Sequence, residues 1–170
     1  MAVTEPTSLV ICDAGPLIHL EELGCLDLLR DFGAVQVPDA VWQEVQRHRR
    51  SALRHRNVTL ERMSSSPEAA PELVHLAQAF LLDAGELEAL KLMQQSPGAI
   101  LLTDDAAARR VAKRLDYEVH GTIGVVVRAL RRQQRTKRQV LNLLHSIPRR
   151  SSLFIEARLL DSVIEEVNKA

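Results

Sequence analysis

The chain of 170 residues is poor in the residues that mark several common classes of protein. It has only two cysteines, Cys12 and Cys25. They are too few for a disulfide framework or a zinc site, so we expect a reducing, cytoplasmic setting. Aromatic residues make up 3% of the chain, which argues against a base-stacking surface for single strands. No apolar run approaches the roughly 20 residues of a membrane-spanning helix, and residues 1–8 lack the features of a signal peptide.

The chain also lacks a net charge, because 22 basic residues balance 22 acidic ones. Bulk charge alone therefore gives it no affinity for a polyanion. The charges are nevertheless segregated, since no acid occurs between Gly121 and Ile155 or between Arg47 and Arg56. Basic stretches of this kind are typical of a surface that contacts a phosphate backbone, although a solvated helix face would explain each arginine equally well.

Short apolar runs alternate with helical patterns along the whole chain. Runs at 9–12, 35–37, 58–60, 99–102 and 117–120 predict strands, and amphipathic segments between them predict helices, among them 73–82 and one that continues to Pro148. This alternation predicts an α/β protein with three layers, α/β/α, around a mainly parallel sheet. We expect one domain over residues 8–170, with a flexible N-terminus at 1–7 and a closing C-terminal element at 151–170.

Two of the predicted strands end in aspartate. Asp13 follows the first apolar run, and Thr103, Asp104 and Asp105 follow the run at 99–102. The carboxyl ends of parallel strands lie at one edge of a sheet, and that edge is where open α/β folds bind ligands. We therefore expect these acids to lie close together, although each could instead cap the helix that follows it.

Two predicted helices each place a glutamate on or beside the apolar face. Glu44 adjoins Val45, and Glu86 lies on the inward stripe of the helix that starts near Asp83. Burying an unpaired carboxylate is costly, so each glutamate should have a partner. A capping box between Asp83 and Glu86 is a competing explanation, Glu44 could be half exposed, and Glu88 is expected on the solvated face.

Several carboxylates at one edge need a counter-charge. Two like charges ~4 Å apart repel by on the order of 4 kcal/mol at an effective dielectric near 20, so either the pKa values rise or a divalent cation lies among them. Oxygen ligands favour Mg²⁺ or Mn²⁺ over zinc. Such an ion can activate water and stabilise phosphate charge, which indicates metal-assisted hydrolysis of a phosphodiester. Thr103 could orient a water or an aspartate there, or be an ordinary strand-end threonine.

Other chemistries find less support. The chain has no glycine-rich phosphate loop and no Gly-x-Ser-x-Gly motif, and its six histidines show no metal-ligand spacing. A receiver-like phospho-acceptor domain also groups aspartates at strand ends. Such a domain would need the acid pair after the first strand and a lone aspartate later, whereas here the pair comes later.

Four segments in order resemble the PIN-domain nucleases, and within them the VapC-toxin-like group. They are VICDAGPLI at 10–18, VPDAVWQEV at 37–45, DAGELEAL at 83–90 and LLTDD at 101–105. The stretch VHGTIGV at 119–125 also resembles a bacterial PIN subfamily. This resemblance, which covers nearly the whole chain, implies a PIN-like α/β/α domain with an acidic pocket at the strand ends. It also implies Mg²⁺- or Mn²⁺-dependent endoribonuclease activity.

The resemblance also implies roles for particular residues. By position, the catalytic residues would be Asp13, Glu44, Glu86 and Asp105, with Asp104 and Thr103 assisting. The metal would be held by Asp13, Glu86, Asp105 and Asp104, and which of the two neighbouring aspartates is the main ligand stays open. The implied partners are RNA, a second copy in a homodimer and, for a toxin, a small antitoxin protein; no membrane is involved.

The chain departs from the family's pattern at one place. Family members commonly have serine or threonine two positions after the first aspartate, and this chain has Gly15. A hydroxyl near the metal would therefore be missing. An alternative to the nuclease is accordingly a PIN-fold protein with weak catalysis that binds RNA or regulates another process.

Overall fold

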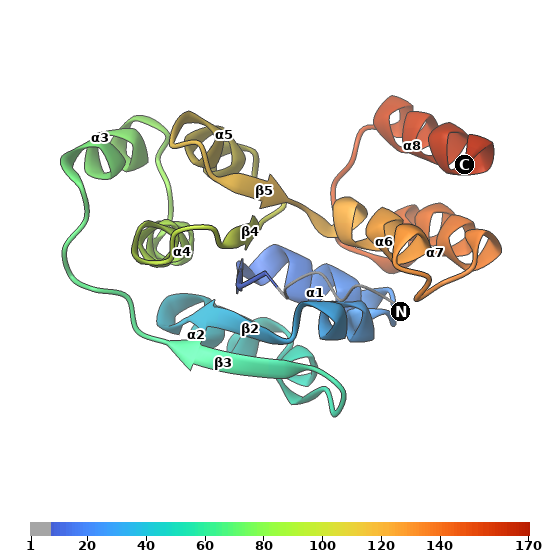
Figure 1. Cartoon of the computed structure of the whole chain (residues 1–170), viewed down its shortest axis with the longest axis horizontal. Helices are drawn as coiled ribbons and strands as arrows, with labels where there is room; N and C mark the ends of the chain where they lie inside the picture. Colours follow the sequence, from blue (N-terminus) through green and yellow to red (C-terminus); the bar gives the residue numbers. More distant parts are fainter. Residues whose placement is uncertain (1–7) are drawn as a thin grey trace, which may run out of the picture.

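The apolar runs form one five-stranded sheet in the computed structural model, which describes residues 8–170 (Figure 1). The strands are β1 (Val10–Cys12), β2 (Ala34–Pro38), β3 (Thr59–Met63), β4 (Ile100–Leu102) and β5 (Glu118–His120). Every pairing is parallel, in the order β3-β2-β1-β4-β5. The predicted α/β class is thus confirmed. The predicted flexible segment 1–7 lies outside the described residues.

The strand order reverses at β1. Val10 pairs with Val35 of β2 on one side and with Ile100 of β4 on the other, so the chain leaves β1 in one direction and later continues in the other. In open α/β sheets, such a reversal leaves a crevice outside the carboxyl ends of the two central strands. Asp13 and the turn that begins at Thr103 lie at these ends of β1 and β4.

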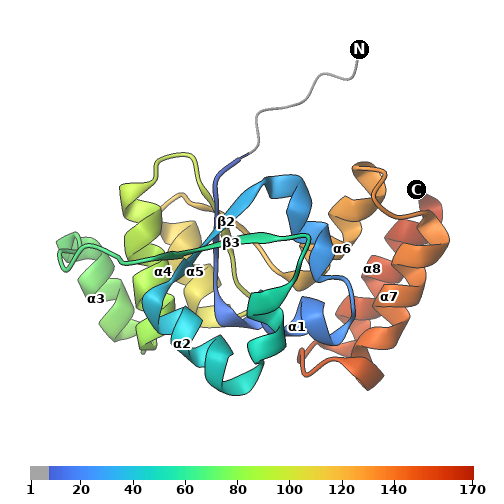
Figure 2. The same cartoon turned by 90° about the horizontal axis from the view of Figure 1, so that it is seen from below.

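Helices cover both faces of the sheet. They are α1 (Ala14–Glu22), α2 (Asp39–His48), α3 (Pro71–Ala79), α4 (Ala84–Gln95), α5 (Ala106–Arg114), α6 (Thr122–Arg131), α7 (Lys137–Arg150) and α8 (Ala157–Lys169), with 3-10 segments η1 (Leu26–Phe32) and η2 (Arg50–Arg54). Figure 2 shows α3, α4 and α5 on one side of the sheet and α1, α6, α7 and α8 on the other. The three predicted layers are therefore present.

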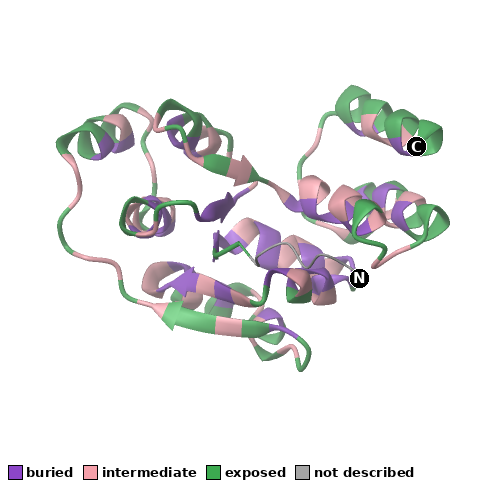
Figure 3. Cartoon of the chain, viewed as in Figure 1, coloured by how far each residue is buried: buried purple, intermediate pink, exposed green. Residues whose placement is uncertain are grey.

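Two apolar cores hold these layers together, because successive side chains of a strand point to opposite faces. Val10 and Cys12 belong to the core that includes α1, α6 and α7, whereas Ile11 and Leu101 belong to the core beneath α4 and α5. Figure 3 shows the buried residues concentrated in the central strands and on the inner faces of the helices. In residues 8–170 no helix has both the length and the apolar character that a membrane crossing requires.

Two helix boundaries differ from the prediction. The helix expected through Leu82 ends at Ala79, because Leu81 takes a left-handed backbone conformation with φ 53°. Conversely, α7 runs past Pro148 to Arg150. Proline cannot donate a helical N–H, yet the last turn still closes, since the backbone N–H of Ser151 donates to the carbonyl of Ile147.

Candidate active site

Asp13 links the ends of β1 and β4. One carboxylate oxygen, Oδ1, accepts a 2.8 Å hydrogen bond from the backbone N–H of Ala14 and caps α1, and Oδ2 accepts a 2.8 Å bond from Thr103 Oγ1. The backbone N–H of Asp13 donates to the carbonyl of Leu102. Both Asp13 and Thr103 are buried. The predicted helix cap is therefore real, and it leaves the other oxygen of the carboxylate aimed at the turn after β4.

Burial makes the charge of Asp13 expensive. It raises the pKa of Asp13 from 3.8 to about 6, although the hydrogen bonds from Thr103 and Ala14 oppose this rise. The negative charges of Asp83 and Glu44 raise it further. The side chains around Asp13 thus add negative charge, and in the described part of the chain no positive group close by offsets it.

Asp83 and Glu86 form the predicted capping box at the start of α4. Asp83 Oδ1 accepts from the backbone N–H of Glu86 at 2.8 Å, and Glu86 Oε2 accepts from the backbone N–H of Asp83 at 2.9 Å. Burial also raises the pKa of Glu86 to about 7, and the charges of Asp83, Asp105 and Asp13 add to that rise against the opposing backbone bond from Asp83. Glu86 thus caps its helix and also faces the other acids.

Glu44 of α2 faces the start of α4. It is half-buried, and in residues 8–170 its carboxylate accepts no hydrogen bond. A Cβ atom added to Gly85 would lie 3.1 Å from Val41 Cγ2, 3.4 Å from Asp83 Oδ1 and 3.6 Å from Glu44 Oε2, so both carboxylates approach Gly85. Burial and the charge of Asp83 raise the pKa of Glu44, whereas His48 and Arg47 lower it.

Asp105 completes the group of acids. Its Oδ1 caps α5 by accepting from the backbone N–H of Ala108 at 2.8 Å, and its own N–H donates to Thr103 Oγ1 at 3.2 Å. Its charge contributes to the raised pKa of Glu86. Charges within this group raise the pKa values of Asp13, Glu44 and Glu86. We call its five members the acidic cluster: Asp13, Glu44, Asp83, Glu86 and Asp105.

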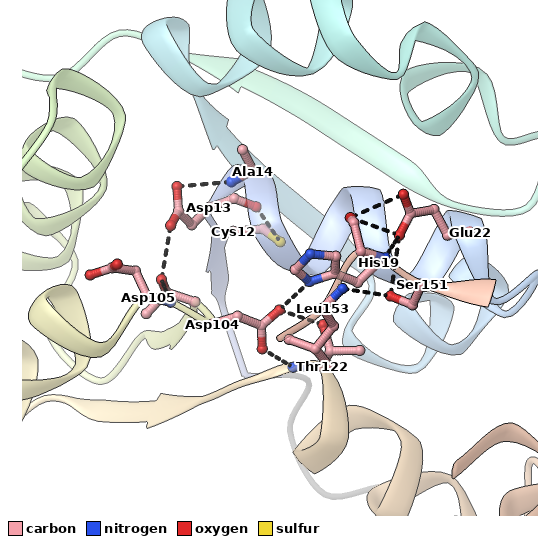
Figure 4. Close-up of polar contacts among 12 residues, drawn as sticks. Cys12, Asp13, Ala14, His19, Glu22, Asp104, Asp105, Thr122, Ser151 and Leu153 are labelled. Carbon is pink, nitrogen blue, oxygen red and sulfur yellow. Dashed lines mark hydrogen bonds and ion pairs between the residues drawn. The ribbon is translucent and has the colours of Figure 1, made fainter. Parts of the chain in front are cut away.

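Asp104 points away from Asp13 and Asp105, toward His19 and Thr122 (Figure 4). Its Oδ2 is 2.7 Å from His19 Nδ1 and accepts from Thr122 Oγ1 at 2.6 Å, and its Oδ1 accepts from the backbone N–H of Thr122 at 2.7 Å. Burial would raise the pKa of Asp104, but the bonds from His19 and Thr122 lower it overall. Asp104 therefore ties the turn after β4 to α1 and to the start of α6.

Sequence reasoning did not find some of these partners. His19 and Thr122 come from segments far from Asp104 in the sequence, and no local pattern signals their contact. Glu88 is a correction: it does not lie free on the solvated face, because its Oε2 accepts from the backbone N–H of Ala40 at 2.9 Å. One feature of the sequence could have predicted this contact. Pro38, at the N-cap of α2, has no side-chain acceptor, so the first N–H groups of that helix need an acceptor from elsewhere.

The basic stretches are partly neutralised by ion pairs. Asp31 pairs with both Arg128 and Arg132, Asp27 pairs with Arg135, and Glu21 pairs with Arg49. These pairs link α6 and the turn after it to η1, and the end of α2 to α1. The basic groups that act on the acidic cluster are Arg47 and His48, at the end of the helix that carries Glu44.

The donors of the acidic cluster are all carboxylate oxygens, which suit a hard divalent ion such as Mg²⁺ or Mn²⁺. The raised pKa values of Asp13 and Glu86 also fit a cation among these acids. Within residues 8–170, however, no three His, Cys, Asp or Glu side chains are arranged so that they could hold a metal ion as they stand. The acidic cluster therefore suits a divalent ion by the type of its donor atoms and by its negative charge.

Comparison with known proteins gives one finding. A family model described as DUF3368: PIN domain matches residues 9–169. No curated protein and no solved structure matches the chain in the other two comparisons. The matched range runs from the residue before β1 into α8 and includes every member of the acidic cluster.

Proposed function

This chain belongs to the PIN-domain family, and from that premise we propose that it is a divalent-metal-dependent endoribonuclease that hydrolyses RNA phosphodiester bonds. PIN domains are generally nucleases, which gives the reaction class. The observation that carries the proposal is the gathering of acids from four separate segments at the point where the strand order reverses.

Asp13, Glu44, Glu86 and Asp105 are the residues that would hold Mg²⁺ or Mn²⁺. When bound, the ion would supply Lewis acidity and lower the pKa of a water molecule, as phosphodiester hydrolysis requires. Of the two neighbouring aspartates we assign Asp105 to the ion. Both oxygens of Asp104 already accept hydrogen bonds from His19 and Thr122, so we assign Asp104 a positioning role.

Other residues of the chain position the acids and the RNA. Thr103 donates to Asp13 and accepts from the N–H of Asp105, so one hydroxyl fixes two of the acids relative to each other. The N-termini of α1, α4 and α5 point to this edge, and their dipoles favour the negative charge of a phosphate. Arg47 and His48 lie near Glu44 and would contact the RNA backbone without reading its sequence.

Cys12 and Cys25 are both free and buried, which supports a cytoplasmic location. We also propose, from the resemblance to the VapC-like group, that the protein is a toxin, forms a homodimer and binds a small antitoxin protein. The reading frame next to the gene is the place to look for a small DNA-binding partner.

One observation favours the alternative of a weakly catalytic RNA-binding protein. Gly15 supplies no hydroxyl, and a Cβ at this position would lie 3.5 Å from both Asp104 and His19. A side chain at position 15 would therefore contact the partly buried pair of Asp104 and His19.

Incubation of the purified full chain with labelled RNA, with Mn²⁺ or with EDTA, decides between the two. The nuclease gives internal cleavage that EDTA stops. RNA binding with no metal-dependent cleavage would support the alternative instead.

A further inference from the structure

We propose that a cavity beside Asp104 holds one unpaired base of the RNA, next to the bond that is cut, and that Phe154 stacks on that base. This inference rests on the proposed nuclease function and adds a subsite to it. The cavity has a volume of about 370 Å³ and lies between the start of α6, the N-terminal half of α8 and the connector 151–156. Its size is within the range of small-molecule sites, roughly 300–1,000 Å³.

The cavity combines apolar walls with a few polar groups at one end. Ile123, Leu159 and Val163 contribute apolar side chains, and Asp104 and Arg109 contribute charged ones. A nucleobase has the same two-part character, with an apolar face and a polar edge. A mostly apolar cavity with a small number of convergent polar groups is the usual form of a site for such a ligand.

The cavity adjoins the candidate active site through the turn after β4. Arg109 Nη1 donates to the carbonyl of Thr103 at 3.2 Å, and Asp104 separates the cavity from the acidic cluster. A Cβ at Gly121 would lie 2.6 Å from Asp104 Oδ1 and 3.2 Å from Arg109 Nη1, so the glycine leaves this end of the cavity open. An RNA whose phosphate reaches Asp105 therefore has its neighbouring nucleotide beside the cavity.

The charges of the lining favour an uncharged base over a phosphate. Asp104 and Glu156 contribute two carboxylates, whereas Arg109 contributes one guanidinium. The remaining titratable group, His120, has an acid as its own partner, because its Nε2 lies 3.0 Å from Glu118. A phosphate would meet a net excess of negative charge here, but a base edge can use both donors and acceptors.

Phe154 is unusual among the aromatic residues of the chain. Phe32 is buried, and Trp42, Phe80 and Tyr117 are half-buried, whereas Phe154 is 90% exposed. It lines this cavity. Base–aromatic stacking stabilises single-stranded RNA on proteins. The low aromatic content argues against an extended stacking surface, but one base needs only one ring, and among the phenylalanine, tyrosine and tryptophan side chains of residues 8–170 only Phe154 is exposed.

The connector that carries Phe154 is anchored to α1. Glu22 accepts hydrogen bonds from the backbone N–H of Ser152 at 2.7 Å and from Ser151 Oγ at 3.2 Å. Figure 4 shows Ser151 and Leu153 beside Glu22 and His19. These bonds hold the backbone just before Phe154 in place, so less of the connector has to be ordered when a ligand binds.

Binding of a fluorescein-labelled single-stranded RNA hexamer, measured by anisotropy in EDTA, tests the subsite without any cleavage. Phe154→Ala and Phe154→Leu should each weaken binding roughly tenfold to hundredfold, the effect of losing one stacked base. Phe154→Trp should bind at least as tightly as the wild type. Leu81→Ala is the matched control, because Leu81 is 88% exposed but lines a different cavity.

A second probe isolates the base. A hexamer of abasic ribose phosphates should bind the wild type and Phe154→Ala equally, because no base is available to stack. Equal binding of the normal hexamer to the wild type and Phe154→Ala would overturn the subsite. So would full affinity in Phe154→Leu, or a Phe154→Ala variant whose only change is its oligomeric state, which would make this face an interface between copies.

The two proposals fail in different ways. If the wild type cuts no RNA with Mn²⁺, the nuclease proposal is wrong, whereas the anisotropy measured in EDTA still decides the subsite. If the wild type cuts RNA and Phe154→Ala shows unchanged affinity and an unchanged KM, only the subsite is wrong.

Discussion

Thr103 Oγ1 donates a 2.8 Å hydrogen bond to Oδ2 of Asp13, although the two residues are 90 positions apart in the sequence. Both side chains are buried, and the same hydroxyl accepts from the N–H of Asp105. This contact joins the ends of the two central strands, β1 and β4. Through this hydroxyl the positions of Asp13 and Asp105 depend on each other, so the effects of changing Thr103 or Asp13 can be predicted.

Asp13→Asn should abolish Mn²⁺-dependent RNA cleavage while leaving the fold intact, because the amide keeps the shape of the side chain but loses its charge. We expect a loss of about 10²-fold or more, the usual cost of removing one preorganised charge from an active site. A gel assay with labelled RNA measures it. Asp116→Asn is the matched control, since Asp116 is exposed and asparagine tolerates its φ of 57°. Wild-type rates in Asp13→Asn would refute the assignment.

Thr103→Val should destabilise the protein, whereas Thr103→Ser should not. Valine keeps the shape but leaves a buried carboxylate oxygen of Asp13 without its donor, which costs about 1.5–3 kcal/mol of unfolding free energy. The pKa of Asp13 should also rise further, because the bond from Thr103 lowers it in the wild type. Urea denaturation of both variants at about pH 7 tests this prediction. Equal stability of the valine and serine variants would contradict it.

Without divalent ions, the protein should become less stable between about pH 4 and pH 7. The pKa of Asp13 is raised from 3.8 to about 6 in the folded chain, so its contribution to stability is fully present below pH 3.8 and is lost as the pH rises through 6. Glu86 acts in the same direction, with its loss near pH 7. For Asp13 the difference corresponds to about 3 kcal/mol.

Urea denaturation in EDTA across this pH range measures that loss. Asp13→Asn should flatten the curve and be the more stable protein at about pH 8. Mn²⁺ should stabilise the wild type at the same pH, by about 2.7 kcal/mol when its concentration is 100 times the Kd. A wild type that gains stability with rising pH in EDTA would show that these acids are not crowded.

Gly121→Ala should lower both stability and Mn²⁺-dependent activity. The added Cβ would lie 2.6 Å from Asp104 Oδ1 and 3.3 Å from the carbonyl of Thr103, so the turn after β4 must shift. Overpacking of this kind costs about 1–3 kcal/mol. Gly124→Ala is the control for stability, because its nearest new contact, to His120, is 3.4 Å. Thermal unfolding of both variants and RNA cleavage by Gly121→Ala measure the effect, and an unaffected Gly121→Ala would show that Asp104 does not need its present position.

Much of the fold could be predicted from local patterns. Apolar runs that end in aspartate gave the strands β1 and β4, and the inward positions of Glu44 and Glu86 indicated acids that face the core. The capping explanation for Glu86 is confirmed, because its Oε2 accepts from the backbone N–H of Asp83, and the charges of Asp13 and Asp105 also act on this carboxyl group. Whether these acids bind a metal stays a prediction.

The two helix ends that were predicted wrongly, those of α3 and α7, each depend on a single residue. Leu81 ends α3 early by taking a positive φ that leucine rarely adopts, and Pro148 lies inside the last turn of α7. Propensity alone predicts neither, because tertiary packing offsets costs of about 1–3 kcal/mol. The role of Glu88 as the acceptor for Ala40 was missed for the same reason, since it depends on the packing of α4 against α2.

The sequence by itself determined which segments are strands and helices and which strands end in acids, because side-chain periodicity and helix caps act over a few neighbouring residues. Only the tertiary structure decided that Asp105 belongs to the acidic cluster while Asp104 faces His19 and Thr122. The two aspartates are adjacent and chemically identical. Their different roles follow from the strand order, which brings α1 and the start of α6 to one side of the turn and α4 to the other.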